Sequence, residues 1–333
     1  MRTASVMLQN LCVPCGCRCR YCLLSWAGRC VGVGYERSER FARRFHDWIA
    51  AERPDVEFNF SFGYSMEHPR LFEALAFLRS IGSVGGEFLQ CDGMRFRSAA
   101  EIDELMGGLR SAGVRSLNFT FYGTAAYHDR FAGRAGDYEH LLHMIDGAVR
   151  HGFETSAGIP LTRESASQAD DLLDALNGRH IGRVFLFVPH AEGRGVLIDP
   201  IRFSQNDYNA LSDAARALLN TNRFKTEDKW FAQGRFAEPE TRSLLISLTP
   251  ENIDRLEQTP FAEIIAEAER LDDEYYRALP SCEALARRYG NPDSGLFYGW
   301  RDLLAHYQKR FIQENNLSLY DVTDERYTGS RRY

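Results

Sequence analysis

The pattern of hydrophobic and polar residues alternates between two periods through about residue 195. Short apolar runs, which are typical of buried strands, are followed by longer segments whose apolar residues recur every three to four positions, as in amphipathic helices. The predicted strands are residues 5–9, 56–62, 87–90, 116–121, 154–159 and 183–188. The predicted helices are residues 38–51, 69–80, 99–112, 138–150 and 165–176.

Several predicted helices end at a glycine that comes shortly before the next strand, as at Gly82, Gly113 and Gly152. Glycine is favoured just past a helix end because it adopts the left-handed conformation without strain. Six strands that alternate with helices imply a parallel sheet, which is either barrel-like or doubly wound. The sequence therefore predicts an α/β fold.

The remainder of the chain has a different pattern. Residues 242–248 form the one clear strand candidate, and helical spacing runs through residues 209–219, 260–278, 283–289 and 298–313. We therefore predict a first domain over residues 1–200 and a mostly helical C-terminal extension over residues 201–333 that closes the substrate side.

Composition narrows the class of protein. The chain has 333 residues, of which 44% are hydrophobic, and a formal net charge of -6. This balance gives no electrostatic argument for binding nucleic acid or an anionic membrane. No apolar run approaches the roughly 20 residues that span a bilayer, and the N-terminus lacks a secretory signal. We predict a cytoplasmic protein, in which clustered cysteines stay reduced and serve as ligands or reactive thiols.

Six of the eight cysteines lie within residues 12–30. Cys15, Cys19 and Cys22 follow the first strand with a spacing of three and then two intervening residues. A zinc site usually takes two separated pairs of ligands, whereas an iron–sulfur cluster accepts thiolates on one tight loop. Three thiolates on a four-iron cluster leave one iron open to a ligand. Cys12, Cys17 and Cys30 lack this spacing and are interpreted as spare thiols.

This spacing, with Tyr21 just before the last cysteine, resembles the signature of the radical S-adenosylmethionine superfamily. The resemblance covers about residues 5–195. It implies a partial (β/α)6 TIM-like barrel and a 4Fe-4S cluster held by the three cysteines. It also implies S-adenosylmethionine on the open iron, which is cleaved reductively to a 5′-deoxyadenosyl radical that abstracts a substrate hydrogen. Flavodoxin or ferredoxin would supply the electron.

Members of this family carry a Gly-Gly-Glu-like segment at the end of the second strand, which binds the amino group of the cofactor. The literal Gly-Gly-Glu at residues 85–87 precedes the third strand, so it is expected at the opposite end of the barrel. Residues 62–69 are the better match, and Tyr64, Ser65 and Glu67 are the predicted ligands. For Glu67, a carboxylate at a helix start is the alternative.

The other predicted cofactor contacts follow from the same resemblance. Thr120 and Tyr122 occupy the positions of the serine and aspartate that the family carries on the fourth strand. Pro189 begins the segment after the sixth strand, which flanks adenine in relatives. His128 and Asp129 are interpreted as structural residues of the loop after the fourth strand.

Two isolated cysteines are possible hydrogen-atom donors to a product radical. Cys91 follows the third strand and is expected to point toward the barrel mouth; its alternative is a buried apolar residue. Cys282 is the second candidate and the only cysteine of the C-terminal part. A cysteine-rich auxiliary-cluster (SPASM) domain is therefore not recognised.

The resemblance implies an enzyme that acts on a small biosynthetic substrate, namely a sugar, an aminocyclitol or a nucleoside. Dehydrogenation, epimerisation, deoxygenation and decarboxylation remain open as outcomes. The alternative is modification of a peptide, although about ten residues before the cysteine loop leave no room for a leader-binding domain. A non-enzymatic zinc-binding or cluster-binding interaction protein is a second alternative.

Overall fold

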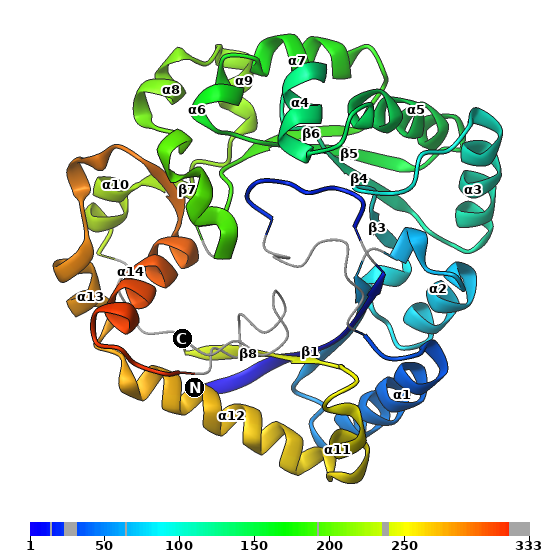
Figure 1. The fold of residues 1–333 in the computed structure, drawn as a ribbon, viewed down its shortest axis with the longest axis vertical. Coiled ribbons are helices and arrows are strands. Elements are labelled where there is room, and N and C mark those ends of the chain that lie inside the picture. The colour runs from blue at the N-terminus through cyan, green and yellow to red at the C-terminus, as the bar shows by residue number, and fades with distance from the viewer. Residues whose placement is uncertain (14, 23–31, 64, 192, 235–239, 320–333) are drawn as a thin grey trace.

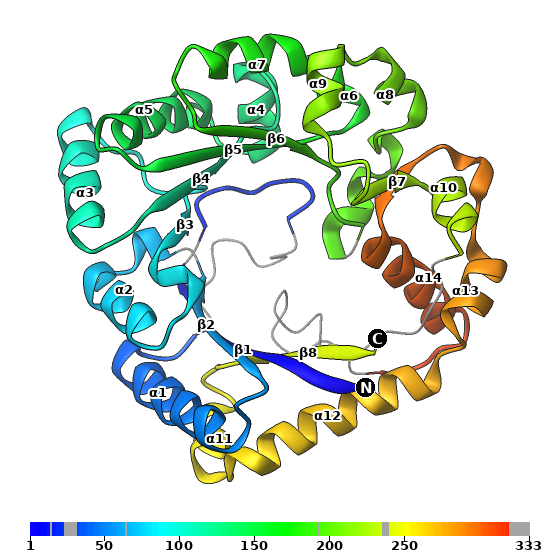
Figure 2. The same cartoon turned by 180° about the vertical axis from the view of Figure 1, so that it is seen from behind.

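The computed structural model describes residues 1–13, 15–22, 32–63, 65–191, 193–234 and 240–319. Strands line part of the inside of a ring and helices cover its outside (Figures 1 and 2). The N-terminal strand lies beside a strand from the C-terminal part, which places residues 2–9 next to residues 241–247. The predicted partial barrel is confirmed.

The elements agree closely with the predicted ranges. The strands are β1 (Arg2–Val13), β2 (Glu57–Gly63), β3 (Phe88–Gln90), β4 (Ser116–Thr120), β5 (Glu154–Pro160), β6 (Arg183–Phe187), β7 (Phe224–Thr226), β8 (Thr241–Ser247) and β9 (Phe297–Gly299). The helices are α1 (Tyr35–Glu52), α2 (Leu71–Ser80), α3 (Ala99–Ser111), α4 (Ala125–Ala132), α5 (Asp137–Arg150), α6 (Arg163–Ala166), α7 (Ala169–Asn177), α8 (Gln205–Ala210), α9 (Asp213–Leu218), α10 (Glu227–Ala232), α11 (Ile253–Gln258), α12 (Phe261–Ala278), α13 (Cys282–Tyr289) and α14 (Trp300–Glu314). Short 3-10 helices are η1 (Ser65–Glu67), η2 (Val84–Gly86), η3 (Gly193–Ile201) and η4 (Pro292–Ser294).

The barrel consists of two parallel sheets. One has the strand order β2-β1-β8 and the other β3-β4-β5-β6, and every pairing in both is parallel. Parallel strands place all their carboxyl ends at one end of the barrel, where side chains from several strands meet. Gly82, Gly113 and Gly152 have the predicted positive φ, at +66°, +85° and +73°.

The two faces of the strands differ in chemistry. The outward face carries apolar residues that pack under the helices, such as Val6, Leu8 and Phe60 under α1 and α2. The inward face is mostly polar and includes Ser5, Gln9, Asn59, Ser61, Gln90, Asn118, Ser156, Ser243 and Ser247. A closed eight-stranded barrel fills its interior with branched apolar side chains. This interior instead offers hydrogen-bonding groups.

The C-terminal part contributes to the barrel as well as covering it. Strand β8 pairs with β1, and Arg242 on β8 bonds Asp272 of α12 at 3.1 Å, with both side chains buried. Helices α10, α13 and α14 complete the ring between β8 and β7 (Figure 1). The division at residue 200 stays a prediction.

Some elements differ from the prediction. Residues 165–176 and 209–219 each form two short helices rather than one. In the second case, Leu211 leaves the helical conformation and Ser212 caps α9 by accepting the Ala215 N–H. The short β7–β9 pair and helix α4 had no sequence pattern long enough to predict them. No helix of the described residues is long and apolar enough to cross a membrane.

Candidate metal and cofactor site

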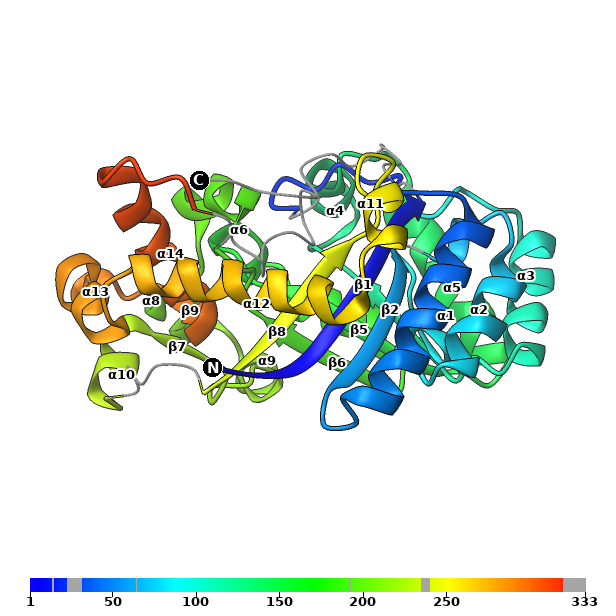
Figure 3. The same ribbon diagram turned by 90° about the horizontal axis from the view of Figure 1, so that it is seen from below.

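The cysteine loop lies at the end of the barrel where β1 finishes, as the view along the side of the strands shows (Figure 3). Two backbone hydrogen bonds hold it there. Gly16 N donates to Gly93 O at 2.7 Å, and Arg18 N donates to Ala132 O at 2.7 Å. The loop is therefore fastened to the turn that follows β3 and to the end of α4.

Gly93 gives the loop the space it needs. Its φ is +64°, and a Cβ built on it would lie 2.2 Å from the Cys15 Sγ. No real Cβ tolerates such a contact, so any other residue here would displace either the cysteine or the turn. The sequence Gln-Cys-Asp-Gly after the third strand thus contains a glycine that the position of Cys15 requires.

The cysteines of the loop share one apolar cluster. Cys15, Cys17 and Cys19 are buried with the aromatic rings of Tyr122, Tyr127 and Phe131, and Cys22 packs against the same cluster. The described residues contain no group of three His, Cys, Asp or Glu side chains that is already placed around a metal ion. The cluster-ligand assignment of Cys15, Cys19 and Cys22 therefore stays a prediction.

The donor chemistry of the loop fits an iron–sulfur cluster. Its potential ligands are thiols in apolar surroundings, which suit iron better than they suit a hard cation. The hydrogen bond with Cys17, together with burial, raises the pKa of the Cys15 thiol, so the thiol stays neutral without a metal. A bound metal favours the thiolate and reverses this preference.

Of the predicted cofactor residues, Tyr21 belongs to the loop and Tyr122 lies directly beside it. The Tyr122 hydroxyl is 3.0 Å from the Cys19 Sγ. The Tyr21 ring makes an edge contact with the Tyr122 ring at 5.9 Å, and it also packs against Phe131 at 5.7 Å and His190 at 5.4 Å. Tyr21, Tyr122 and the segment after β6 are thus brought together, as the resemblance implies.

A buried polar network supports the loop from behind. The Asp137 Oδ2 accepts from the His128 Nε2 at 3.1 Å and from the Cys17 Sγ at 3.5 Å, and its Oδ1 accepts from the Arg134 Nη1 at 2.9 Å. The Tyr122 N–H donates to the His128 Nδ1 at 3.2 Å, which places the ring proton on Nε2. These contacts are consistent with the interpretation of His128 as a structural residue of the loop after β4.

Asp129 has a structural position too. Its carboxylate accepts from the Gly136 N–H at 2.5 Å and from the Tyr138 N–H at 2.9 Å at the start of α5. A carboxylate at a helix N-terminus satisfies free backbone donors and interacts well with the helix dipole. The interpretation of Asp129 as a loop-fixing residue is consistent with these contacts.

A second polar network crosses the interior face below the loop. The Asn118 Nδ2 donates to the Gln90 Oε1 at 2.7 Å, and the Ser156 Oγ donates to the Asn118 Oδ1 at 2.7 Å. Asp92 accepts from the Thr120 N–H at 2.9 Å and from the Gln90 Nε2 at 2.5 Å. Thr120, which is predicted to contact the cofactor, therefore lies among polar groups of β3, β4 and β5.

Asp92 is the charged member of this interior network. Burial raises the pKa of its carboxyl to about 6, although hydrogen bonds from Thr120 and Gln90 oppose the shift. A carboxyl group with such a pKa changes its protonation near neutral pH, which is typical of functional sites.

The predicted amino-group ligands after β2 have other neighbours. The Glu67 Oε1 accepts from the Arg97 Nη1 at 2.6 Å and from the Arg95 N–H at 3.1 Å. The carboxylate is thus paired with arginine, and its predicted contact with the cofactor would require it to exchange partners. Tyr64 lies outside the described residues, and of Ser65 only the backbone, in η1, is described.

Pro189 is held by a buried arginine. The Arg202 guanidinium donates to the Pro189 O at 3.0 Å and to the Gly195 O at 3.3 Å, and it pairs with Asp199 at 2.7 Å. Arg202 also stacks on the Tyr298 ring at 4.8 Å. This arginine fixes the segment after β6 against the C-terminal part. It had no signal in the sequence.

The expected orientation of Cys91 is wrong. Strand residues alternate between faces, and Gln90 occupies the interior face of β3, so Cys91 joins Leu89 in the apolar cluster under the helices. Its exposed fraction is 0% and its Sγ lies 3.8 Å from the Leu89 O. Cys282 is buried at the start of α13. Helix α13 lies on the outer side of the ring (Figure 1). The donor role of both thiols stays a prediction.

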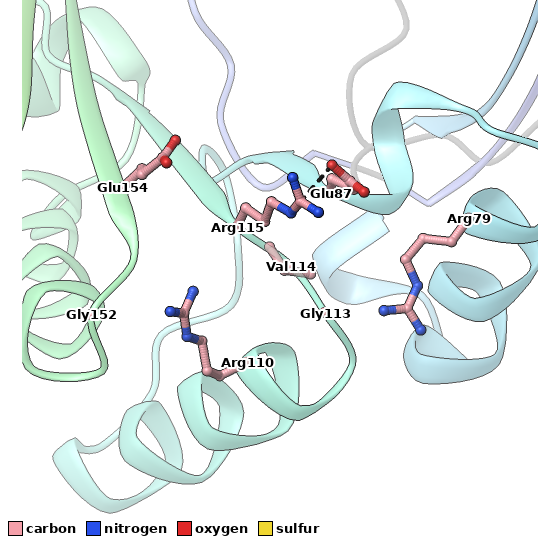
Figure 4. Close-up of a pocket in the computed structure, with 8 residues that line it drawn as sticks. All are labelled: Arg79, Glu87, Arg110, Gly113, Val114, Arg115, Gly152 and Glu154. Carbon is pink, nitrogen blue, oxygen red and sulfur yellow. Dashed lines mark ion pairs between the residues drawn. The ribbon is translucent and has the colours of Figure 1, made fainter.

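A surface pocket lies at the opposite end of the strands. It has a volume of about 500 Å³ and is lined by Arg79, Arg110, Arg115, Glu87 and Glu154 among others (Figure 4). Glu87 pairs with Arg115 at 3.5 Å, with both side chains exposed. The literal Gly-Gly-Glu of residues 85–87 therefore ends in this pocket, away from the cysteine loop, as predicted.

No family model and no curated protein matches the chain, but solved structures do. SuiB from Streptococcus suis, bound to the precursor peptide SuiA, is 10% identical; the match covers 73% of this chain and 49% of that chain, with a TM-score of 0.48. Coproporphyrinogen III oxidase HemN from Escherichia coli, described as a radical SAM enzyme, is 14% identical. That match covers 64% of this chain and 48% of that chain, with a TM-score of 0.36. The structure of anSMEcpe with bound AdoMet is 14% identical. That match covers 61% of this chain and 57% of that chain, with a TM-score of 0.44.

Of these structures, HemN is described as a radical SAM enzyme and anSMEcpe is described with bound AdoMet. The chain spans about half the length of these structures. The features of this chain that bear on function are the cysteine loop and the barrel interior beneath it.

Three site residues had sequence signals that the prediction did not use. Asp92 lies next to the glycine that follows the third strand, and Asp137 begins a helix directly after Gly136. Ser156 lies on β5 between Thr155 and Ala157, which are both buried, so its side chain faces the other side of the strand. Their partners come from distant parts of the chain, so their roles emerge only from the fold.

Proposed function

We propose that this protein is a radical S-adenosylmethionine enzyme that acts on a small polar substrate. Cys15, Cys19 and Cys22 would hold a 4Fe-4S cluster, which in this family supplies the electron that cleaves S-adenosylmethionine to a 5′-deoxyadenosyl radical. One observation supports this proposal most strongly. The cysteine loop is fastened over the carboxyl ends of parallel strands, at the mouth of a polar barrel interior.

The interior face supports a polar substrate. Gln90, Asn118 and Ser156 bond one another across three strands, yet each retains capacity for a further hydrogen bond. Met7 is 39% exposed on the same face of β1, so this interior is accessible. Sites that hydrogen-bond a substrate reject analogues without the matching groups. A sugar, an aminocyclitol or a nucleoside provides such groups.

Anaerobic reconstitution tests the proposal. The wild-type protein should bind about four irons per chain and form 5′-deoxyadenosine from S-adenosylmethionine with dithionite. Alanine at Cys15, Cys19 or Cys22 should abolish both. Cys12→Ala and Cys282→Ala are matched controls that should retain the cluster. A wild-type chain that binds zinc, or that yields no 5′-deoxyadenosine, would favour the non-enzymatic interaction protein instead.

The substrate class needs a separate experiment. Binding of a true substrate should accelerate 5′-deoxyadenosine formation above the rate with cofactor alone. We expect acceleration with members of a panel of sugars, aminocyclitols and nucleosides. Acceleration by peptides alone would establish the alternative, which is modification of a peptide. We also propose a cytoplasmic location and flavodoxin or ferredoxin as the reductant. Reduction of the cluster by either protein would support the reductant proposal.

A further inference from the structure

The Tyr122 hydroxyl faces one of the proposed cluster ligands, and its position is firmly determined. It lies 3.0 Å from the Cys19 Sγ, and the Tyr122 side chain is buried. The Tyr122 ring stacks on Phe131 at 4.8 Å and packs against His128 at 5.2 Å. Both neighbours belong to α4, so the end of β4 and one helix together aim the hydroxyl at the sulfur.

The backbone fixes the same residue from the other side. The Tyr122 N–H donates to His128, and His128 in turn donates to the buried Asp137 carboxylate. A ring held by two aromatic contacts and a hydrogen-bonded backbone has little freedom to turn away. The distance between the hydroxyl and the sulfur is thus set in part by residues outside the cysteine loop.

We infer that Tyr122 is a positioning residue that tunes the reduction potential of the cluster by donating a hydrogen bond to the Cys19 thiolate. This inference rests on the proposed function. A phenol is protonated at neutral pH, and a ligating thiolate offers only lone pairs, so the tyrosine is the donor. Hydrogen bonds to cluster sulfurs and solvent exposure are among the factors that set cluster potentials.

The direction of the effect follows from charge. Reduction adds an electron to the cluster and increases negative charge on its ligands. A donor aimed at the sulfur stabilises the reduced state more than the oxidised state. Tyr122 therefore raises the potential, and its removal lowers it. A tenfold change in the one-electron equilibrium corresponds to about 59 mV, and we expect a change up to this size.

The test compares Tyr122→Phe with Tyr127→Phe in the reconstituted full chain. Tyr127 belongs to the same buried aromatic cluster, but its hydroxyl is 3.2 Å from the Thr162 Oγ1, so Tyr127→Phe removes a hydroxyl without touching a cysteine. Redox titration of the reduced-cluster EPR signal, without S-adenosylmethionine, should give a lower potential for Tyr122→Phe alone. Equal potentials in wild type and Tyr122→Phe, at equal iron content, would overturn the inference.

A second measurement covers the case in which Tyr122→Phe fails to load iron. Fluorotyrosine incorporated at position 122 keeps the ring and makes the hydroxyl a stronger donor, so the potential should rise; an unchanged or lower potential refutes the inference. The proposed function fails separately, if the wild-type chain forms no cluster. The wild-type chain could also cleave S-adenosylmethionine while Tyr122→Phe and the fluorotyrosine variant have the same cluster potential as wild type. That result would refute only the tuning role.

Discussion

The Cys17 thiol lies 3.5 Å from the Asp137 carboxylate, which ties the cysteine loop to the first residue of α5. Cys17 has no place in the spacing of the proposed ligands, yet it is more deeply buried than Cys15 and Cys19. Because Asp137 also accepts from His128 and Arg134, one carboxylate joins the loop, α4 and α5. Cys17 is thus a structural contact of the loop rather than a spare thiol.

Replacement of Asp137 by alanine should destabilise the fold substantially. It would leave His128 and Arg134 in a largely buried site without their acceptor, and losing one partner of a buried pair costs roughly 3 kcal/mol of unfolding free energy. Asp146, on the same helix, pairs with Arg179 in a more exposed setting, so Asp146→Ala should cost less than about 1 kcal/mol. Urea unfolding of both variants measures the difference. Equal losses would show that the network does not support the loop.

Gly93→Ala should prevent cluster loading because its Cβ would occupy the place of the Cys15 sulfur. Gly82 offers a matched control: its φ is +66°, close to that of Gly93, but its Cβ would meet nothing within 4 Å. Gly82→Ala should therefore cost about 1 kcal/mol from backbone strain and retain iron. Iron content after reconstitution distinguishes the variants. If Gly93→Ala bound as much iron as wild type, the claim that Cys15 requires a glycine at position 93 would be wrong.

Much of the fold could be predicted because it depends on local patterns. Each predicted barrel strand is present, and the glycines after helices α2, α3 and α5 adopt the expected conformation. The pairing of β8 with β1 could not be predicted, since it joins residues more than two hundred positions apart. Periodicity reports which face of a strand is apolar; it does not report the neighbouring strand.

The site divides in the same way. The cysteine spacing and Tyr21 are contiguous in sequence and could be recognised, whereas the contact of Tyr122 with Cys19 depends on where β4 ends relative to the loop. The error on Cys91 had a simple cause. Its place after the strand suggested the barrel mouth, but alternation from Gln90 turns it under the helices.

Asp92 should make stability depend on pH in the direction opposite to most carboxylates. Its pKa is raised to about 6 by burial, so the folded state favours the protonated form. The contribution of this group is fully present below the unfolded pKa near 4 and is lost as the pH rises through 6. Asp92→Asn removes the effect. The unfolding free energy of Asp92→Asn minus that of wild type should therefore increase by up to about 3 kcal/mol as the pH rises from 4 to 7.

Asp103 provides the control of opposite sign for Asp92. The hydrogen bond with His151 lowers the pKa of the Asp103 carboxyl, so its contribution is present at neutral pH and is lost as the pH falls. Asp103→Asn should therefore lose stability relative to wild type at neutral pH and not at low pH. Urea unfolding of the metal-free proteins at several pH values measures both. An Asp92→Asn difference that is constant with pH would contradict the raised pKa.

Adjacent residues of β4 should respond very differently to truncation, because they lie on opposite faces of the barrel. Leu117 is fully buried under the helices, and Leu117→Ala should cost about 3 kcal/mol of unfolding free energy from lost burial and the cavity left behind. Asn118 faces the polar interior, where water can replace its bonds to Gln90 and Ser156. Asn118→Ala should therefore cost about 1 kcal/mol or less. Urea unfolding measures both changes, and comparable losses would mean that the interior is packed and dry rather than open to a polar substrate.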